Sequence, residues 1–219
     1  MAMPGAVPIG VGDVDARLAR FGLSVADLHG RVVLPASGLS RVVTPFHPRN
    51  ERGRVFYAEA TAGLRRVGVE KGWNCDDTDG VARSVSPDGT VVVVVATGNE
   101  FTGLPGAEAV VTTKFNRGPR LLDGVVSELG YTFDKIAPEV FPFTSPAPTS
   151  PVREVWLLLL CPAGGEVRIE LSRPEGRDVA GFPRPFIERI LIPPLRTGDI
   201  GDGDFDLGDG DIDVPVLDR

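Results

Sequence analysis

The sequence predicts an α+β fold: a mainly antiparallel sheet with a few short helices and a disordered, acidic C-terminal tail. Two apolar runs, 91–96 and 155–161, have the length of buried strands and are much shorter than the roughly 20 apolar residues of a membrane helix. The 27 glycines and 20 prolines in 219 residues indicate many turns and argue against a helical bundle. We expect one domain over residues 13–197, after a disordered segment (1–12) and before the tail (198–219).

Two short helices are predicted near the N-terminus. Asp13 is a candidate cap for a helix whose apolar side chains recur at i, i+4 and i+7: Val14, Leu18 and Phe21. Ser24 and Asp27 have the spacing of a capping box for a second helix that ends near Gly30. Two helices around a glycine also fit a helix-turn-helix, but Asp27 is acidic where DNA readers carry basic or amide side chains. We therefore interpret both as packing helices.

A longer helix is predicted after the proline-containing loop 42–55. Asn50 is its candidate cap, and it is expected to run to about Val67. Its apolar face contains Phe56, Ala60, Leu64 and Val67. The next segment, 71–80, is polar and is expected to be a loop.

The strands are predicted from apolar runs and turn residues. Pro87 and the pair Asp88-Gly89 favour a turn that joins two hairpin strands over 81–97. Because 91–96 has no polar alternation, we expect it to be a central strand buried on both faces. The sequence next predicts a helix over 120–130, a strand over 131–137 and a proline-rich crossing over 138–151.

The last part of the domain is predicted to be a hairpin over 152–174 and a final strand over 185–194. The 43 residues of 152–194 are few for an independent core. We therefore expect their strands to extend the first sheet or to pack on it.

The formal net charge of −7 lies entirely in the tail. Residues 198–219 carry eight Asp and one Arg, and the other 197 residues carry 22 acidic and 22 basic side chains. The neutral body gives no electrostatic reason to bind nucleic acid or a membrane. The two cysteines, 86 residues apart, form no CxxC pair, and the N-terminus lacks the basic start and apolar region of a signal peptide. We expect a cytoplasmic protein.

The 73–79 loop is the first candidate for chemistry. Asp76, Asp77 and Asp79 are candidate ligands of Ca²⁺ or Mg²⁺, which prefer carboxylate oxygens. Cys75 is a weaker candidate nucleophile, because the flanking aspartates raise a thiol pKa rather than lower it. The plainer interpretation is a polar turn in which Trp73 packs inward.

The 98–103 loop supplies Glu100 as a further candidate carboxylate. Asp88, the following strand and Glu100 imitate part of a nuclease pattern, but Thr102 stands where that pattern needs Lys. Gly98 and Gly103 have the spacing of a phosphate-binding loop, but Leu104 and Pro105 replace its Lys and Ser/Thr.

The tail has several possible roles. Asp202, Asp204 and Asp206 have the spacing that opens an EF-hand-like calcium loop, but Leu207 stands where that loop needs glycine. Acidic and apolar residues alternate in "DFDL" and "DIDV", a pattern typical of disordered interaction tails and also compatible with an edge strand. Imitation of DNA by the tail alone is a further alternative.

The sequence therefore favours a non-enzymatic binding or accessory protein that acts through a protein partner, with no cofactor and no nucleic-acid or membrane partner. The tail is expected to be one attachment point, to a basic surface. The alternative is a metal-dependent hydrolase or nuclease in which Asp76, Asp77 and Glu100 are catalytic, with Asp79 as a further ligand of Ca²⁺ or Mg²⁺. The sequence leaves the oligomeric state open.

Overall fold

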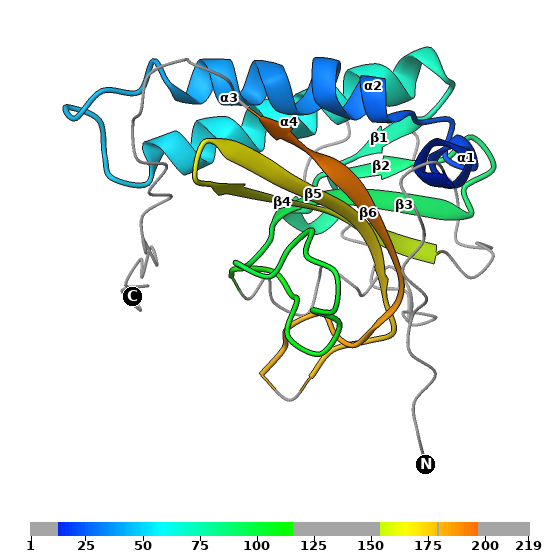
Figure 1. Ribbon diagram of the computed structural model, residues 1–219. Coiled ribbons are helices and arrows are strands. Elements are labelled where there is room, and N and C mark those ends of the chain that lie inside the picture. The colour runs from blue at the N-terminus through cyan, green and yellow to red at the C-terminus, as the bar shows by residue number, and fades with distance from the viewer. Residues whose placement is uncertain (1–12, 116–153, 179, 197–219) are drawn as a thin grey trace, which may run out of the picture.

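The computed structural model describes residues 13–115, 154–178 and 180–196, in which helices cover one face of a six-stranded sheet (Figure 1). The expected N-terminal segment (1–12) and acidic tail (198–219) lie outside the described residues. So do the predicted helix 120–130, strand 131–137 and crossing 138–151.

The first helices are α1 (Val14–Ala19) and the consecutive α2 (Val25–Asp27), η2 (Leu28–Val33) and α3 (Leu34–Ser40). The predicted capping box is confirmed: the Asp27 N–H donates to Ser24 Oγ at 3.1 Å, and the Ser24 N–H donates to Asp27 Oδ2 at 3.2 Å.

The prediction that this helix ends near Gly30 is wrong, because it continues through a π-helical turn to Ser40. Leu28, Val32, Val33 and Ala36 are completely buried. Their packing outweighs the low helix propensity of glycine.

Helix α4 (Glu51–Glu70) has the predicted apolar face, and its members Phe56, Ala60, Leu64 and Val67 are buried. The capping role predicted for Asp13 and Asn50 is wrong, since neither side chain accepts a cap hydrogen bond. Among the helices of the described segments, none is long and apolar enough to cross a membrane.

The sheet follows chain order. Its strands are β1 (Asn74–Asp76), β2 (Arg83–Val85), β3 (Val91–Thr97), β4 (Glu154–Ala163), β5 (Glu166–Pro174) and β6 (Phe186–Arg196). Only β3 and β4 pair in parallel, and the other neighbours are antiparallel. The α+β class with a mainly antiparallel sheet is thereby confirmed, and the late strands extend the first sheet as expected.

The polar segment 71–80 is more ordered than predicted. It contains β1 and the 3₁₀ helix η3 (Thr78–Gly80), because β1 pairs with β2 at the sheet edge. The predicted hairpin turn is present: the Gly89 N–H donates to Ser86 O at 2.9 Å, and Gly89 has a φ of 73°. Only glycine adopts that φ without strain.

Both faces of the central strands are buried, which explains their uninterrupted apolar runs. On the helix face, Val93, Trp156 and Leu158 join the main core, and Phe21 meets Trp156 edge to face with ring centroids 4.9 Å apart. On the opposite face, the second cluster includes Val92, Val94, Leu157, Leu159 and Val111. In Figure 1 the green segment 98–115 lies on this side of the sheet, away from the helices.

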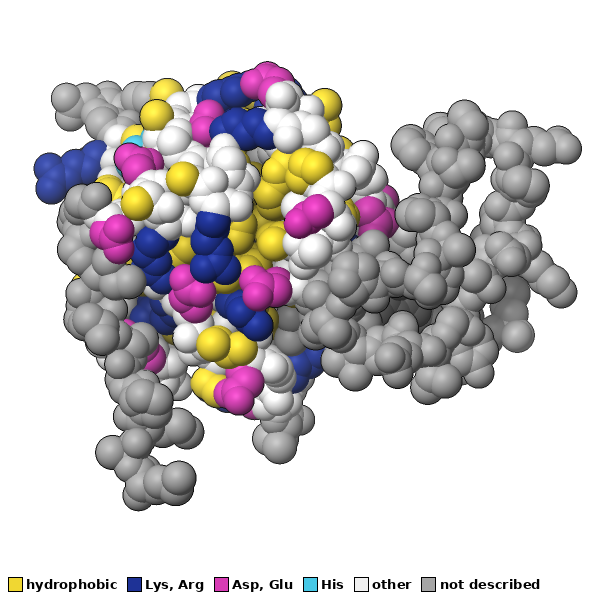
Figure 2. Space-filling model, turned by 90° about the vertical axis from the view of Figure 1, so that its right-hand side faces the viewer, with side chains coloured by type: hydrophobic (Ala, Val, Ile, Leu, Met, Phe, Trp, Pro, Cys, Tyr) yellow, Lys and Arg dark blue, Asp and Glu magenta, His cyan; other side chains and the backbone are white. Residues whose placement is uncertain are grey.

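Ion pairs attach α1 to the sheet. Glu188 of β6 pairs with Arg17 at 2.8 Å and with Arg20 at 3.2 Å, and Arg20 also lies 3.4 Å from Glu154 of β4. Figure 2, which faces the α1 end, shows basic and acidic side chains interleaved beside a band of hydrophobic ones. This end of the molecule therefore carries balanced charge.

Candidate functional site

Asp76 and Asp77 lie together at the end of β1, but each has its own local partner. Asp77 receives two hydrogen bonds from the Arg65 guanidinium, at 2.7 and 3.2 Å. Asp76 Oδ1 accepts the Thr78 N–H at 2.8 Å, and its Oδ2 lies 3.9 Å from Arg83 Nη1. These contacts stabilise the turn, as the plainer interpretation of the sequence expects.

Glu100 lies elsewhere. Asp76 pairs with Arg83, and Arg83 pairs with Val94, so β1 is two strands away from β3. Glu100 follows the end of β3, and its backbone oxygen accepts a 2.8 Å bond from Arg168 on β5, on the other side of β3 from β1. With about 4.8 Å between strands, the structure does not bring Glu100 to the Asp76–Asp77 pair.

The described residues contain no group of three or more His, Cys, Asp or Glu side chains arranged to hold a metal. The side chain of Asp79 and the tail residues Asp202, Asp204 and Asp206 lie outside what the structure describes. The metal-dependent hydrolase thus stays a prediction without support from the described carboxylates.

The cysteines are free thiols in different surroundings. Cys75 is exposed on the edge strand β1, and Cys161 is buried near the end of β4. Burial raises the pKa of the Cys161 thiol, and the nearby Arg168 guanidinium offsets only part of that effect. A thiol with a raised pKa is a poor nucleophile at neutral pH.

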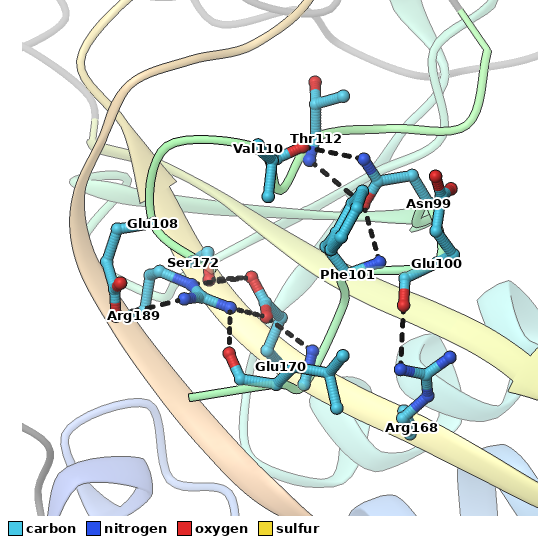
Figure 3. A network of polar contacts seen from close by, with 12 residues as sticks. Asn99, Glu100, Phe101, Glu108, Val110, Thr112, Arg168, Glu170, Ser172 and Arg189 are labelled. Atoms are coloured by element: carbon cyan, nitrogen blue, oxygen red, sulfur yellow. Dashed lines mark hydrogen bonds and ion pairs between the residues drawn. The ribbon is translucent and has the colours of Figure 1, made fainter. Parts of the chain in front are cut away.

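A buried ion pair that the sequence analysis did not single out lies on the second face of the sheet. Glu170 of β5 is completely buried and Arg189 of β6 is 8% exposed. The guanidinium donates to Glu170 Oε2 at 2.5 Å and to Oε1 at 3.2 Å (Figure 3). Such a two-point pair is strong and fixes the orientation of both groups.

Segment 98–113 is attached to this pair. The Gly103 N–H donates to Glu170 Oε2 at 2.7 Å, and Arg189 donates to the Leu104 carbonyl at 3.3 Å and to Glu108 at 3.4 Å. Ser172 Oγ donates to Glu170 Oε1 at 2.8 Å. Each oxygen of Glu170 therefore accepts two hydrogen bonds, which leaves the carboxylate no lone pair for acid–base work. The pair fixes a loop to the sheet.

The cavity beneath α4 is small. Its volume is ≈ 10 Å³, which is about the room for one water molecule, and its lining is mostly apolar: Leu23, Leu64, Gly68, Trp73, Ser84 and Val93. It does not accommodate an organic ligand.

The α3–α4 turn, residues 41–50, exposes apolar side chains on an ordered backbone. Phe46 is 98% exposed and Val42 is 69% exposed, and Leu39 at the end of α3 is also exposed. The His47 N–H donates to Thr44 O at 3.0 Å, the Thr44 N–H donates to His47 Nδ1 at 3.0 Å, and the Glu51 N–H donates to Pro48 O at 2.9 Å. Proline at 45 and 48 restricts the backbone on both sides of Phe46.

Arginines flank this aromatic side chain. Segment 41–54 contains four arginines and one glutamate. Arg52 donates to the Val43 carbonyl at 3.2 Å, and Arg54 pairs with Glu51 at 2.9 Å. Arg49 is exposed next to Pro48. Aromatic and arginine side chains carry much of the binding energy at protein interfaces, so this turn is the best candidate site among the described residues.

No protein-family model, curated protein or solved structure matches this chain. The candidate site is therefore interpreted from its own geometry. It is a turn between two helices of an α+β protein, with an exposed aromatic side chain and flanking arginines.

Proposed function

We propose that this chain is a non-enzymatic binding or accessory protein, and that its protein partner docks on the α3–α4 turn. The observation that carries the proposal is Phe46, 98% exposed at a turn held by internal hydrogen bonds. An ordered loop loses little conformational entropy on binding, so more of the contact energy appears as affinity.

The side chains of the turn indicate which kind of surface the partner presents. Phe46 and Val42 call for an apolar contact, and the surplus of arginines in 41–54 calls for carboxylates beside it. The partner therefore presents an acidic surface with at least one apolar side chain. A reducing compartment such as the cytoplasm suits the two free thiols, Cys75 and Cys161.

Affinity capture with quantitative mass spectrometry tests the proposal, using the full chain and three variants. Phe46→Ser removes the aromatic contact, Arg49→Glu reverses one flanking charge, and Ile187→Ser removes another exposed apolar side chain, 54% exposed on β6. Burial of a Phe side chain contributes about 1.5–3 kcal/mol, which corresponds to about tenfold or more in Kd.

We expect the wild type and Ile187→Ser to capture the same acidic protein. Phe46→Ser and Arg49→Glu should no longer capture it. Equal capture by all four chains, or loss with Ile187→Ser alone, contradicts the proposal. Because Phe46 makes almost no contact with the other described residues, Phe46→Ser should melt close to the temperature of the wild type, which separates lost binding from lost folding.

A further inference from the structure

The α3–α4 turn and the C-terminal tail carry opposite local charge. Segment 41–54 has four arginines and one glutamate, in a body of residues 1–197 whose total formal charge is zero, and residues 198–219 have eight aspartates and one arginine. A basic surface for the acidic tail is thus present within the same chain.

The tail also contains the combination of side chains expected of a ligand of the turn, which is apolar residues beside carboxylates. In "DFDL" (204–207) and "DIDV" (211–214), every apolar residue is preceded by an aspartate, and Phe205 and Ile212 are also followed by one. Phe205 or Ile212 matches the apolar Phe46 and Val42, and the flanking aspartates match the arginines of the turn. Two copies of the same pattern, seven residues apart, offer the turn two equivalent ligands.

The tail starts close enough to reach the turn. Strand β6 lies against the helical layer, where His29 Nε2 of η2 is 2.8 Å from the Pro193 carbonyl. Figure 1 shows β6 ending over α3, on the side of the molecule where α3 leads into the α3–α4 turn. Asp202 comes six residues after Arg196, which allows about 20 Å of extended chain, whereas the seven residues of α3 span about 10 Å.

We propose that the acidic tail, residues 198–219, docks on the α3–α4 turn of its own chain and occupies it until a partner displaces it. A tethered segment acts at an effective concentration of the millimolar order, so even a weak contact keeps the turn occupied. This inference rests on the proposed function, because it assigns the same surface an internal ligand that the partner must displace.

The test compares the full-length wild type with a full-length variant whose tail lacks six carboxylates: Asp202→Ser, Asp204→Ser, Asp206→Ser, Asp209→Ser, Asp211→Ser and Asp213→Ser. Backbone amide NMR spectra of the two chains are recorded at low salt, and that of the wild type also at high salt. We expect the amides of 39–54 to differ between the chains and high salt to shift the wild type towards the variant, because salt screens exposed charges. The amides of 186–189 serve as the control and should coincide.

A binding measurement completes the test. A labelled peptide of residues 201–214 should bind the neutralised variant at least about tenfold more tightly than the wild type, whose turn is already occupied. Adding Phe46→Ser to the neutralised variant should abolish that binding.

Coincident amides at 39–54, or equal peptide affinity for both chains, overturns the inference. If the amide chemical shifts depend on protein concentration and light scattering gives the mass of a dimer, the inference is also overturned, because the turn is then occupied by the tail of a second copy. Partner capture can fail while the tail still docks, and docking can fail while a partner is captured, so each proposal fails separately.

Discussion

The buried Glu170 carboxylate and the Arg189 guanidinium, on the adjacent strands β5 and β6, are joined by hydrogen bonds of 2.5 and 3.2 Å. The same carboxylate accepts the Gly103 N–H, 67 residues away in sequence, at 2.7 Å. One ion pair therefore joins two adjacent strands to the segment that covers the second face of the sheet.

Breaking this pair on one side should destabilise the fold strongly. Glu170→Gln leaves the buried guanidinium with only the partly exposed Glu108 carboxylate, 3.4 Å away, as a counter-charge, and Arg189→Met leaves a buried carboxylate without its own. Each is expected to lower the free energy of unfolding by about 3–5 kcal/mol. Urea denaturation followed by far-UV circular dichroism measures the loss.

The double variant Glu170→Gln/Arg189→Met is the control for this prediction. It removes both charges, and the side-chain amide that replaces the carboxylate still offers the Gly103 N–H an acceptor. Its loss of stability should be smaller than the sum of the single losses. Additive losses would contradict a coupled pair.

A close approach between helices α4 and η2 gives the second prediction. A Cβ at Gly63 would lie 2.4 Å from the Arg31 carbonyl oxygen and 2.9 Å from Val32 Cα. Both are backbone atoms, which cannot move aside as a flexible side chain can. Gly63→Ala should therefore destabilise the protein by about 1–3 kcal/mol, despite the higher helix propensity of alanine.

Gly38 in α3 is the matched control, because a Cβ there meets nothing within 4 Å. Gly38→Ala should raise stability by about 0.5–1 kcal/mol. Thermal denaturation of both variants measures the two effects. Opposite signs support the steric explanation, whereas a loss of stability at both positions would contradict it.

Local patterns in the sequence were sufficient to predict several elements. The buried face of α4, from Phe56 to Val67, follows from helical periodicity, and β3 follows from a short apolar run of β-branched residues, which favours a strand. The hairpin turn before β3 follows from Pro87 and Gly89. In each case residues close in sequence determine the structure.

The features that sequence patterns did not predict depend on contacts between distant residues. Gly30 favours a helix end locally, but the core contacts of Leu28 and Val32 keep the helix continuous. The parallel pairing of β3 with β4 joins residues 63 positions apart in the sequence, such as Val91 and Glu154.

The buried polar pair was missed for the same reason. In β5, Glu170 alternates with the apolar Ile169 and Leu171, which is the pattern of a strand with one solvated face. That face is buried only because segment 98–113 covers it. Phe46 was also missed, because its exposure depends on how two helices meet.

The two thiols should differ in reactivity. Cys75 is exposed, whereas Cys161 is buried and has a pKa raised by burial. With an aromatic disulfide reagent at pH 8, we expect the Cys75 thiol to react at once. The Cys161 thiol should react more slowly by about two orders of magnitude or more, because it becomes accessible only when the structure opens locally.

Cys75→Ser is the control for this assignment. It should remove the fast phase and leave the slow one, and denaturant should then convert the slow phase into a fast one. A fast phase that survives in Cys75→Ser would contradict the burial of Cys161.

The hairpin turn before β3 should make stability depend on pH. The Ser86 hydroxyl donates to Asp88 at 2.5 Å, and the Thr90 N–H and hydroxyl donate at 3.1 and 2.8 Å, which together hold the pKa of Asp88 below its ordinary value of 3.8. A carboxyl whose pKa is lower in the folded state stabilises the fold above its unfolded pKa, and this contribution disappears as the pH falls through the folded pKa.

Asp88→Ala isolates this contribution from the other carboxyls that titrate in the same range. The wild type should melt at a higher temperature than Asp88→Ala by a constant margin above about pH 5, and the margin should shrink steadily below about pH 4. Melting temperatures of both chains at a series of pH values measure it. A margin that stays constant down to about pH 2 would mean that the hydrogen bonds of the turn do not depend on the charge of Asp88.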